Sequence, residues 1–337
     1  MARLSICIPS YNRTTYLCEL LDSILAQAPG DVEVVVCDDA SPDDPSAAME
    51  PYRQRFAHFT YIRQPTNLGL FENFLSAVEH ASGDFIWLMG DDDRLEPGGL
   101  DRVRAALETS PGITGMTVGV VDYDSDMRAP VGLRDMPPSQ DLQTAEEVFT
   151  LIPEHLGFMS ALVINRQQWL TVVSRYPAAS FQNYYPQVHI IGLTLKHFGG
   201  WKIIHTPCVR YRSDNDQFGT SLGWVKRLKV DVESYDEVAR NVFPDSPTTR
   251  RAIAAATLRT HVISRIVNLK TGSTEAVSVL PVATYLLRYY WSHVKFWTVA
   301  LPLLLLPRPA VGWLKTLYRT FMPSSGARRV TRLKDGT

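Results

Sequence analysis

Short apolar segments alternate with amphipathic ones at a regular period through the first hundred residues. The apolar segments are rich in branched side chains, which is typical of strands buried on both faces, and they span residues 4–8, 32–37, 59–63 and 84–89. The segments between them carry apolar side chains at helical spacing, at residues 17–25, 47–56 and 71–80. This alternation predicts a doubly wound, Rossmann-like α/β sheet with right-handed crossovers.

Three consecutive carboxylates, Asp91, Asp92 and Asp93, follow the strand predicted at residues 84–89. Adjacent like charges repel one another, which lowers stability or raises one of the pKa values. A divalent cation that holds a diphosphate removes this conflict, because Mg²⁺ or Mn²⁺ binds one or two carboxylates together with substrate phosphates. An isolated triplet of this kind is more often a solvated turn before a helix. Its place at the end of a buried strand favours the metal interpretation.

Polar segments follow two other predicted strands in the same way. Residues 10–12 (Ser-Tyr-Asn) come after the first strand, and Asp38 and Asp39 come at the end of the second. The carboxyl ends of parallel strands share one edge of a sheet, and ligands bind outside that edge. The sequence therefore predicts one crevice that these segments and the Asp triplet line together.

The overall composition gives no sign of a nucleic-acid partner. The chain has 337 residues, enough for one large α/β domain and an appendage, and a net charge of −1. Residues 307–337 hold seven of the 34 basic and one of the 35 acidic residues, which leaves 27 basic and 34 acidic residues, or −7, before them. An acidic body with a basic tail is typical of a protein that meets a membrane surface.

The cysteines and the N-terminus indicate a reducing compartment. No pair of cysteines has the spacing of a zinc site, and two of them lie inside apolar strand patterns; the four are Cys7, Cys18, Cys37 and Cys208. The first apolar run is too short for the core of a signal peptide, because it ends at Pro9. We therefore expect a cytoplasmic protein without a disulfide framework.

Beyond the Asp triplet the pattern becomes less regular. Strands are predicted at residues 115–123, 161–164, 201–204 and 209–212, with a helix at 188–197. Long helices follow from about residue 224, at 225–241 and 247–269. We predict an α/β domain at residues 1–222, made of two halves that meet near residue 100, and a helical region at residues 223–337.

The C-terminal region is rich in aromatic and leucine side chains. Its uncharged run at residues 296–306 is about half of the roughly 20 residues that a membrane-spanning helix needs, and Pro302 interrupts it. Aromatic and basic residues stand together, as in Trp313 and Lys315, which is typical of a segment that lies in the membrane interface. The alternative is a pair of helices that packs on the α/β domain or forms the interface of a homo-oligomer.

Four motifs occur here in the order and spacing of family 2 glycosyltransferases with the GT-A fold. They are Pro-Ser-Tyr-Asn-Arg at 9–13, Cys-Asp-Asp-Ala-Ser at 37–41, Asn-Leu-Gly at 67–69 and Gly-Asp-Asp-Asp-Arg-Leu-Glu-Pro at 90–97. The resemblance covers about residues 4–212. Gly90 stands where many members carry Asp, and this form resembles the abequosyltransferase-type branch that builds bacterial O-antigens.

The resemblance implies a nucleotide-sugar donor, an inverting single displacement and a divalent metal, Mn²⁺ or Mg²⁺. It assigns residues 1–100 to the half that binds the nucleotide-sugar and residues 101–222 to the half that binds the acceptor. Asp39 would accept a hydrogen bond from a pyrimidine base, so the donor would be a UDP-, CDP- or dTDP-sugar. Asp92 would face the ribose or the sugar. Asp93 would face the metal, together with Asp91. Further donor-binding residues are Pro9, Tyr11, Asn12, Asn67 and Arg212, the last as a clamp on the diphosphate.

Several of these residues have a purely structural alternative. Asn12 is equally suited to cap the helix that follows it. Asp38 reads better as a turn residue than as a ligand, and Asn67 and Gly69 as loop-forming residues. Arg212 is as well suited to a structural ion pair as to a phosphate contact.

The catalytic base is the point at which the match to the family ends. Family members usually place an acidic residue at the start of the helix predicted near residues 187–197, and residues 181–189 contain none. His189 is the nearby group whose ordinary pKa suits a general base, and we predict it as the catalytic residue. Packing without a catalytic role is the alternative. Other candidates are Asp122, Asp124 and Glu154.

These observations together predict a metal-dependent, inverting glycosyltransferase of surface-polysaccharide biosynthesis. It would act on a glycan acceptor, such as a polyprenyl-diphosphate-linked oligosaccharide, as a peripheral protein on the inner face of the cytoplasmic membrane. A sugar nucleotidyltransferase needs a glycine-rich loop after the first strand, and a dehydrogenase needs GxGxxG there; residues 10–13 have neither. The remaining rival is a degenerate domain that binds glycans or scaffolds partners.

Overall fold

The computed structural model describes residues 3–110, 112–181, 183–213, 215 and 222–321. The chain divides into two compact units. The sheet unit contains residues 1–145, 155–181 and 186–215, and the helical unit contains residues 146–154, 182–185 and 216–337. The division of the chain at residue 222 and the two halves that meet near residue 100 remain predictions.

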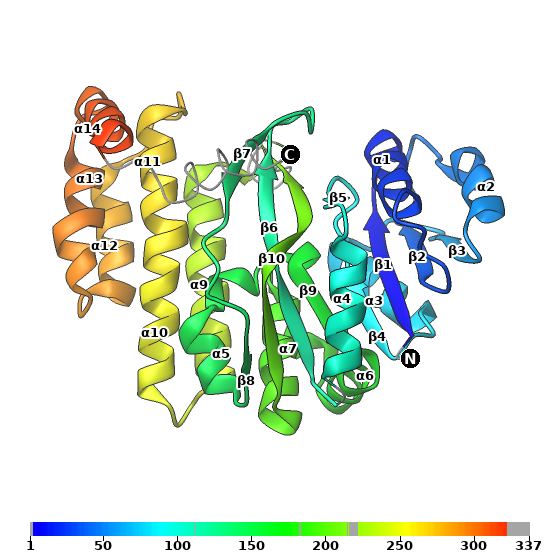
Figure 1. The fold of residues 1–337 in the computed structure, drawn as a ribbon. Helices are drawn as coiled ribbons and strands as arrows, with labels where there is room; N and C mark the ends of the chain where they lie inside the picture. Colours follow the sequence, from blue (N-terminus) through cyan, green and yellow to red (C-terminus); the bar gives the residue numbers. More distant parts are fainter. Residues whose placement is uncertain (1–2, 111, 182, 214, 216–221, 322–337) are drawn as a thin grey trace. The chain divides into compact units, whose positions relative to one another are not determined.

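A mixed sheet of ten strands runs through the described residues of the sheet unit (Figure 1). The strands are β1 (Leu4–Ser10), β2 (Glu33–Asp38), β3 (His58–Arg63), β4 (Phe85–Leu88), β5 (Arg94–Leu95), β6 (Gly115–Tyr123), β7 (Pro130–Leu133), β8 (Gln140–Leu142), β9 (Leu162–Asn165) and β10 (Trp201–Arg212). The main path has the order β3-β2-β1-β4-β9-β6-β10-β5. β1, β2, β3 and β4 pair in parallel, whereas β9 is antiparallel to both β4 and β6.

Helices cover both faces of the N-terminal strands, because alternate side chains of a strand point to opposite faces. Ile6 and Ile8 of β1 share a core with Leu17 of α1 (Thr14–Leu25). Cys7, between them, donates a hydrogen bond to the Ala77 carbonyl of α3 (Leu70–His80) on the opposite face. The predicted doubly wound arrangement is confirmed here. The remaining helices of the unit are α2 (Ser46–Arg55), α4 (Gly99–Thr109), η2 (Met159–Ala161), α6 (Arg166–Arg175), η3 (Ala178–Phe181) and α7 (Pro186–Phe198).

The strands predicted separately at residues 201–204 and 209–212 are one continuous strand, β10. Its pairing with β6 shifts register on both sides of Pro207. Proline has no N–H to donate to a neighbouring strand, so the irregularity falls at this residue. The distorted stretch passes so close to β6 that a Cβ on Gly119 would lie 2.4 Å from the His205 carbonyl oxygen. Glycine at position 119 therefore permits the close approach.

The helical unit is built from helices with their own apolar core (Figure 1). They are α5 (Ala145–Leu151), α9 (Trp224–Val242), α10 (Pro247–Thr257), α11 (Ile263–Thr271), α12 (Val279–Tyr290), α13 (Leu301–Leu305) and α14 (Arg308–Phe321), with π-helical turns η4 (Leu258–Val262) and η5 (Phe296–Ala300). Since η4 joins α10 to α11, the helix predicted at 247–269 is confirmed as one run. No helix in the described residues is both long and apolar enough to cross a membrane.

A buried ionic cluster ties α9 to η4 and α11. The Asp231 carboxylate is fully buried on α9 and lies 3.1 Å from Nη1 of Arg227. It also pairs with Arg265 of α11 and accepts a hydrogen bond of 2.7 Å from the Tyr185 hydroxyl. His261 of η4 lies 3.7 Å away. The Asp231 charge is thus matched by two guanidinium groups, which is the condition for burying it at acceptable cost.

Candidate active site

The carboxyl ends of β1 and β4 lie next to each other in the sheet. The two strands are parallel, with Cys7 of β1 opposite Leu88 of β4. Three residues further along each chain, the Ser10 hydroxyl donates a hydrogen bond of 2.8 Å to Oδ2 of Asp91. On the other side of β1, Ser10 stands opposite Asp38 of β2. The three polar segments that the sequence predicts at one sheet edge do meet there.

A single cation, Arg13, contacts two carboxylates of the Asp triplet. Its Nη1 lies 3.2 Å from Oδ1 of Asp91 and 2.8 Å from Oδ2 of Asp92. Its Nη2 donates to the Asn215 carbonyl at 3.0 Å, and the Asn215 side-chain amide donates to Asp92 at 2.7 Å. Arg13 therefore joins the segments that follow β1, β4 and β10. The carboxylates of Asp91 and Asp92 converge on one positively charged group.

Asp93 points away from Arg13 and into the protein. Its side chain is almost completely buried and accepts a hydrogen bond from the Ser160 hydroxyl. It also accepts one of 3.2 Å from the backbone N–H of Arg212, at the end of β10. Ser160 in turn accepts from the Gly90 amide at 2.9 Å. The turn at residues 90–93 is thus anchored by segments far along the chain.

Burial raises the pKa values of two members of the triplet. Burial raises the pKa of Asp91 to about 6, with Arg13 opposing and Asp92 adding to the shift. Burial, and then the charge of Asp92, raise the pKa of Asp93 to about 8. The expectation that crowding would raise a pKa is confirmed in direction, although burial contributes more than repulsion does. Groups of this kind gather at functional sites, since their burial costs stability that selection otherwise removes.

Arg212 lies beneath the acidic turn and is also almost completely buried. Its guanidinium pairs with Glu19 of α1, stacks over the Tyr16 ring at 4.6 Å, and donates to the Asp92 carbonyl at 3.0 Å. These contacts hold the backbone of the turn in place. The ion pair that the sequence left open is present, and the role of Arg212 as a diphosphate clamp remains a prediction.

Asp39, at the end of β2, uses both carboxylate oxygens to hold a neighbouring loop. Oδ1 accepts from the Leu68 amide at 2.7 Å and Oδ2 from the Gly69 amide at 2.9 Å. The Asn67 side chain donates to the Asp39 carbonyl at 3.3 Å. Each oxygen keeps a second lone pair, so contact with a nucleobase remains compatible with this geometry. The assignments of Asp39 and Asn67 to donor binding remain predictions.

The residues after β1 combine an unusual backbone with an exposed aromatic ring. Pro9 is buried within the strand, whereas the Tyr11 side chain is 42% exposed. Asn12 has φ +55°, in the left-handed region that only a few residues adopt, and its amide donates to the Ser41 hydroxyl at 2.8 Å. Asn12 does not cap α1; Asp43 does so from another loop, accepting from the Thr14 amide at 3.2 Å. The capping alternative for Asn12 is therefore wrong.

His189, the predicted catalytic base, is almost completely buried on α7. It packs edge-on against Phe181 with ring centroids 5.5 Å apart. Burial lowers the pKa of His189, against a hydrogen bond with the Ser180 backbone that raises it. Nδ1 has no hydrogen-bond partner among the described residues. Such surroundings favour a packing role, and the catalytic role of His189 remains a prediction.

Of the acidic alternatives, Asp122 lies closest to the triplet along the sheet. It stands at the end of β6, opposite Tyr211 of β10, next to the residue whose amide binds Asp93. Its Oδ1 accepts from Nε of Arg134 at 2.9 Å, and the charge of Arg134 also acts on Asp93. Asp124 instead accepts from backbone amides of its own turn. Glu154 belongs to the helical unit and pairs with Arg259 at 2.6 Å.

The side chains of the triplet fit a divalent cation in part. No group of three His, Cys, Asp or Glu side chains in the described residues is arranged to hold a metal by itself. Asp91 and Asp92, however, already face one cation, and Mg²⁺ or Mn²⁺ needs only one or two carboxylates when substrate phosphates complete its shell. The donor set therefore suits a metal that arrives with a diphosphate.

The model of glycosyl transferase family 2 matches residues 5–166, which include β1 to β4, the Asp triplet and β9. These residues form a family 2 glycosyltransferase domain. The resemblance that the four sequence motifs indicate is confirmed.

Two curated bacterial glycosyltransferases are similar to this chain. Abequosyltransferase RfbV of Salmonella typhimurium is 27% identical over 276 residues, which cover 76% of this chain and 80% of that protein. The GalNAc(5)-diNAcBac-PP-undecaprenol beta-1,3-glucosyltransferase of Campylobacter jejuni is 32% identical over 101 residues, 30% of this chain and 33% of that one. Similarity to the O-antigen branch thus extends past the matched domain.

Solved structures confirm the GT-A fold of the family 2 domain. Staphylococcus aureus TarS in complex with UDP superposes with a TM-score of 0.57 at 16% identity, over 84% of this chain and 78% of that one. Mannosyltransferase PcManGT from Pyrobaculum calidifontis, in complex with GDP-Man and Mn²⁺, superposes with a TM-score of 0.54 at 16% identity. The superposition covers 94% of this chain and 87% of that one. Identities this low establish the fold and leave the substrate open.

Sequence reasoning missed three residues that shape this glycosyltransferase site. Arg13 lies within the first motif, and its place after a strand end was the available signal. Ser160 and Arg134 gave no signal, since each reaches the triplet from a separate part of the chain. Arg134 lies over the rings of Phe158 and Tyr211, at 4.1 and 4.4 Å from their centroids.

Proposed function

We propose that this chain is an inverting glycosyltransferase that moves a sugar from a pyrimidine nucleotide-sugar, a UDP-, CDP- or dTDP-sugar, to a glycan acceptor of a bacterial surface polysaccharide. The observation that carries the proposal is the convergence of Asp91 and Asp92 on one cation at the carboxyl edge of β1 and β4. TarS with UDP-GlcNAc and PcManGT with GDP-Man support a nucleotide-sugar donor. RfbV supports the O-antigen setting.

The donor would lie across the ends of β1, β2 and β4. Tyr11 offers an exposed ring to the base, and Asp39 a carboxylate that is already held in place by two amides. Asp91 and Asp92 would hold Mn²⁺ or Mg²⁺ with the diphosphate. Sequence reasoning assigned this role to Asp91 and Asp93 and placed Asp92 at the ribose or sugar; both of those assignments remain predictions. The metal, when bound, would neutralise charge on the departing nucleoside diphosphate. Ionised Asp93 would add negative charge behind this site.

The C-terminal half and the relatives support a proposal for the acceptor and the location of the protein. The Campylobacter relative carries undecaprenol in its name, which supports an acceptor linked to a polyprenyl diphosphate. Exposed aromatic residues on the helical unit, such as Trp291 and Trp313, support contact with a membrane surface. We place the protein on the inner face of the cytoplasmic membrane, with self-association of the same helices as the alternative.

The donor site is tested by nucleotide-dependent thermal stability. UDP, CDP, dTDP and GDP are each added to the full chain with and without Mn²⁺. We expect one pyrimidine nucleotide to raise the melting temperature only when the metal is present, because a ligand that binds the folded state stabilises it. The absence of a shift with every nucleotide would contradict the proposal.

The base is tested by comparing Asp122→Asn with His189→Gln. We expect Asp122→Asn to lower the turnover number by about 10²–10⁴-fold, the usual contribution of a general base, and His189→Gln to act mainly on stability. Asp122 is part-exposed next to β10, while His189 is buried behind Phe181. Turnover and stability measured together separate the two: loss of turnover in Asp122→Asn with unchanged stability supports Asp122 as the base, and loss of turnover only in His189→Gln restores the original prediction.

Arg13 provides a separate test of metal binding. In Arg13→Ala the carboxylates of Asp91 and Asp92 lose their shared cation and repel each other without compensation. We expect the variant to melt at a lower temperature than wild type without metal, and Mn²⁺ to stabilise it more than it stabilises wild type. Exposed Arg128 provides the matched control, since Arg128→Ala should change neither value. An equal metal response in Arg13→Ala and wild type would argue against a metal at these carboxylates.

A further inference from the structure

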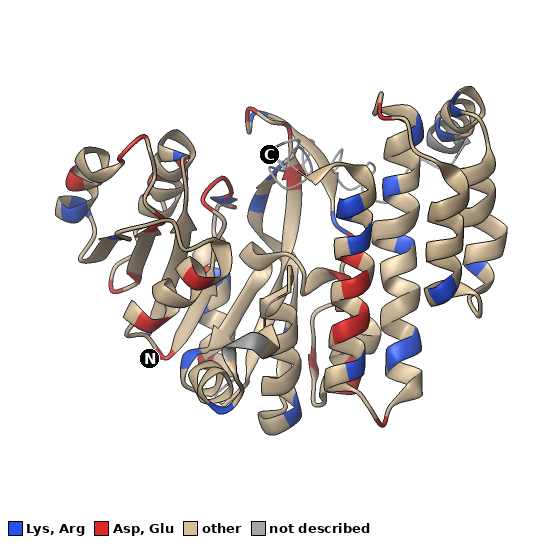
Figure 2. Ribbon diagram, turned by 180° about the vertical axis from the view of Figure 1, so that it is seen from behind, with Lys and Arg blue, Asp and Glu red and all other residues tan. Residues whose placement is uncertain are grey.

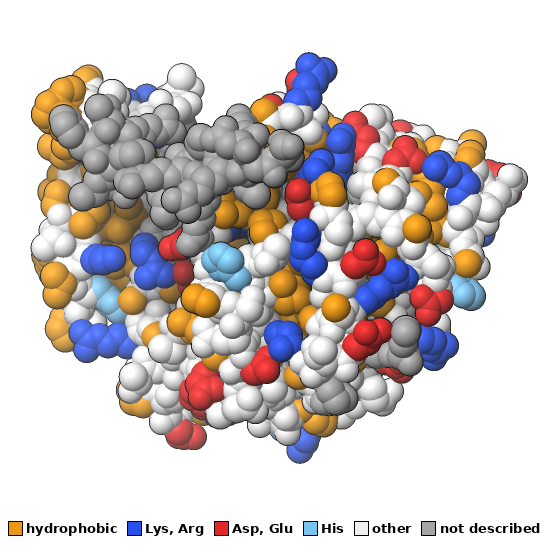
Figure 3. All heavy atoms as spheres, in the orientation of Figure 1, with side chains coloured by type: hydrophobic (Ala, Val, Ile, Leu, Met, Phe, Trp, Pro, Cys, Tyr) orange, Lys and Arg blue, Asp and Glu red, His pale blue; other side chains and the backbone are white. Residues whose placement is uncertain are grey.

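The outer surface of the helical unit exposes large apolar side chains along residues 280–313, from α12 to α14. Figure 3 shows hydrophobic side chains gathered along the outer edge of α12–α14. The most exposed are Leu280, Trp291, Val294, Leu305 and Trp313, each more than 60% exposed. Single exposed apolar residues are ordinary, whereas a continuous set marks a surface that meets another apolar phase.

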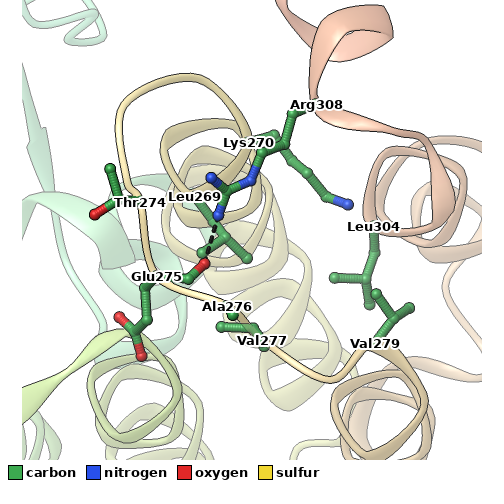
Figure 4. A pocket seen from close by; sticks show the side chains of 9 residues that line it. All are labelled: Leu269, Lys270, Thr274, Glu275, Ala276, Val277, Val279, Leu304 and Arg308. Carbon is green, nitrogen blue, oxygen red and sulfur yellow. Dashed lines mark hydrogen bonds between the residues drawn. The ribbon is translucent and has the colours of Figure 1, made fainter.

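A cavity opens beside this surface, between the end of α11 and the start of α14. It has a volume of about 310 Å³, which is at the lower end for a small-molecule site. Its wall is apolar on one side, formed by Leu269, Val277, Val279 and Leu304, and cationic on the other, formed by Lys270 and Arg308 (Figure 4).

Within the described residues, the cations at the cavity are held by neutral groups. Nζ of Lys270 donates to the Leu306 carbonyl at 2.8 Å, and Arg308 donates to the Glu275 carbonyl. Close by, Nζ of Lys315 donates to the Thr271 hydroxyl at 3.0 Å. None of these three side chains pairs with a carboxylate in the part of the chain that the structure describes. Their charges are therefore positioned but not neutralised.

The surroundings concentrate positive charge at this point. Burial, and then the charge of Arg308, lower the pKa of the Lys270 ammonium, so the two cations disfavour each other. Figure 4 shows the Glu275 carboxylate turned away from both, where it accepts from the Trp224 amide at 3.0 Å. From residue 276 to 321 the sequence contains no acidic residue, and α12–α14 show no acidic patch in Figure 2. An anion at this position would resolve the repulsion.

We propose that the cavity formed by Lys270, Arg308 and the apolar side chains of α11, α12 and α13 binds the phosphate headgroup of an anionic membrane lipid. The inference deepens the proposed membrane contact and rests on it. Two cations suit a phosphate, and the apolar wall suits the chain attached to it. The exposed apolar residues would bring the cavity to the depth of the headgroups, where Trp and Arg are favoured.

The test compares the binding of the full-length protein to two kinds of vesicle, phosphatidylcholine alone and phosphatidylcholine with phosphatidylglycerol. We expect wild type to prefer the anionic vesicles. Each cation near an anionic surface contributes about 1 kcal/mol, so Lys270→Gln/Arg308→Gln should weaken anionic binding roughly thirtyfold. The matched control, Arg288→Gln/Lys295→Gln, removes the same charge from the same unit outside the cavity. It should weaken binding to the anionic vesicles by less than about tenfold. Lys270→Arg should bind as wild type does.

The outcomes separate the cavity from the membrane proposal. Equal losses in the cavity variant and the matched control would overturn the cavity and leave general membrane attraction in place. Failure of wild type to bind either vesicle would overturn both, while the nucleotide panel would still report on the donor site. Saturable binding of inorganic phosphate without vesicle binding would assign the cavity to a soluble anion and overturn the lipid. Arg308→Gln alone, at an exposed position, gives the same comparison if the double variant fails to fold.

Discussion

Above pH 8, where Asp93 is ionised, replacement of Asp93 by Asn should lower sugar transfer by at least about a hundredfold while making the folded protein no less stable. Loss of one preorganised electrostatic group in an active site costs about 10²–10³ in turnover. Asn has the shape of a protonated Asp: its Oδ1 can still accept from the Arg212 amide, and its Nδ2 can donate to the Ser160 hydroxyl. The variant removes the charge and keeps the packing. A loss of activity with no loss of stability would show that the buried charge serves function.

The pH dependence of stability gives this prediction a second readout. The folded pKa of Asp93 is raised to about 8, against about 4 in an unfolded chain. The folded state therefore binds a proton that the unfolded state releases between these pH values. The contribution of Asp93 to the free energy of unfolding accordingly falls as pH rises through this window. In Asp93→Asn this contribution is absent. Urea unfolding at pH values below, within and above the window measures the free energy of unfolding of both proteins.

Asp101→Asn is the matched control for Asp93→Asn. Asp101 is an exposed carboxylate in the first turn of α4, so its replacement should change neither transfer nor the pH dependence. The prediction fails if Asp93→Asn transfers sugar at the wild-type rate above pH 8. It also fails if its stability varies with pH as steeply as that of wild type.

Asp231→Ala should destabilise the helical unit by about 3–5 kcal/mol, the cost of breaking a buried ion pair from one side. The substitution leaves the guanidinium groups of Arg227 and Arg265 facing each other without their shared anion. It also deprives the Tyr185 hydroxyl of its acceptor. We expect the helical unit to unfold at a much lower urea concentration. Hydrogen exchange of the backbone amides of α9 and α11 monitors this transition.

Asp236 offers a matched control on the same helix. It pairs with Arg240 one turn away at 2.7 Å, but both side chains are substantially exposed. An exposed pair of this kind contributes about 0.3–0.5 kcal/mol, so Asp236→Ala should be nearly neutral. If the two substitutions have equal effects, the buried cluster does not stabilise this unit as we infer.

The alternating elements and the shared strand edge were predictable because they depend on local periodicity. Ser10 and Asp91 were expected at one edge, and they form a hydrogen bond there. Which of three consecutive carboxylates turns inward was not predictable, because the choice depends on Ser160 and on the backbone of Arg212. These residues lie 67 and 119 positions further along the chain. Periodicity carries no information about such distant partners.

The burial of His189 left a signal in the sequence that could have been used. Every residue of α7 from Pro186 to Leu195 is buried, and apolar side chains occur on all sides of this segment. A helix that is apolar all round lies inside a protein, so a histidine within it is enclosed unless a cavity reaches it. The catalytic interpretation considered the ordinary pKa of histidine before its burial.

The antiparallel direction of β9, in contrast, left no local signal, since a short apolar run has the same pattern in either direction.

The strand order also determines when the acidic turn can be completed during synthesis. β1 to β4 pair among themselves within the first 88 residues, so this part of the sheet can form early on the ribosome. The two groups that hold Asp93 are translated later, at positions 160 and 212. At about 5–20 residues per second, some 6 to 24 seconds separate Asp93 from Arg212. The nascent chain thus carries its three carboxylates well before it can shape them into a site.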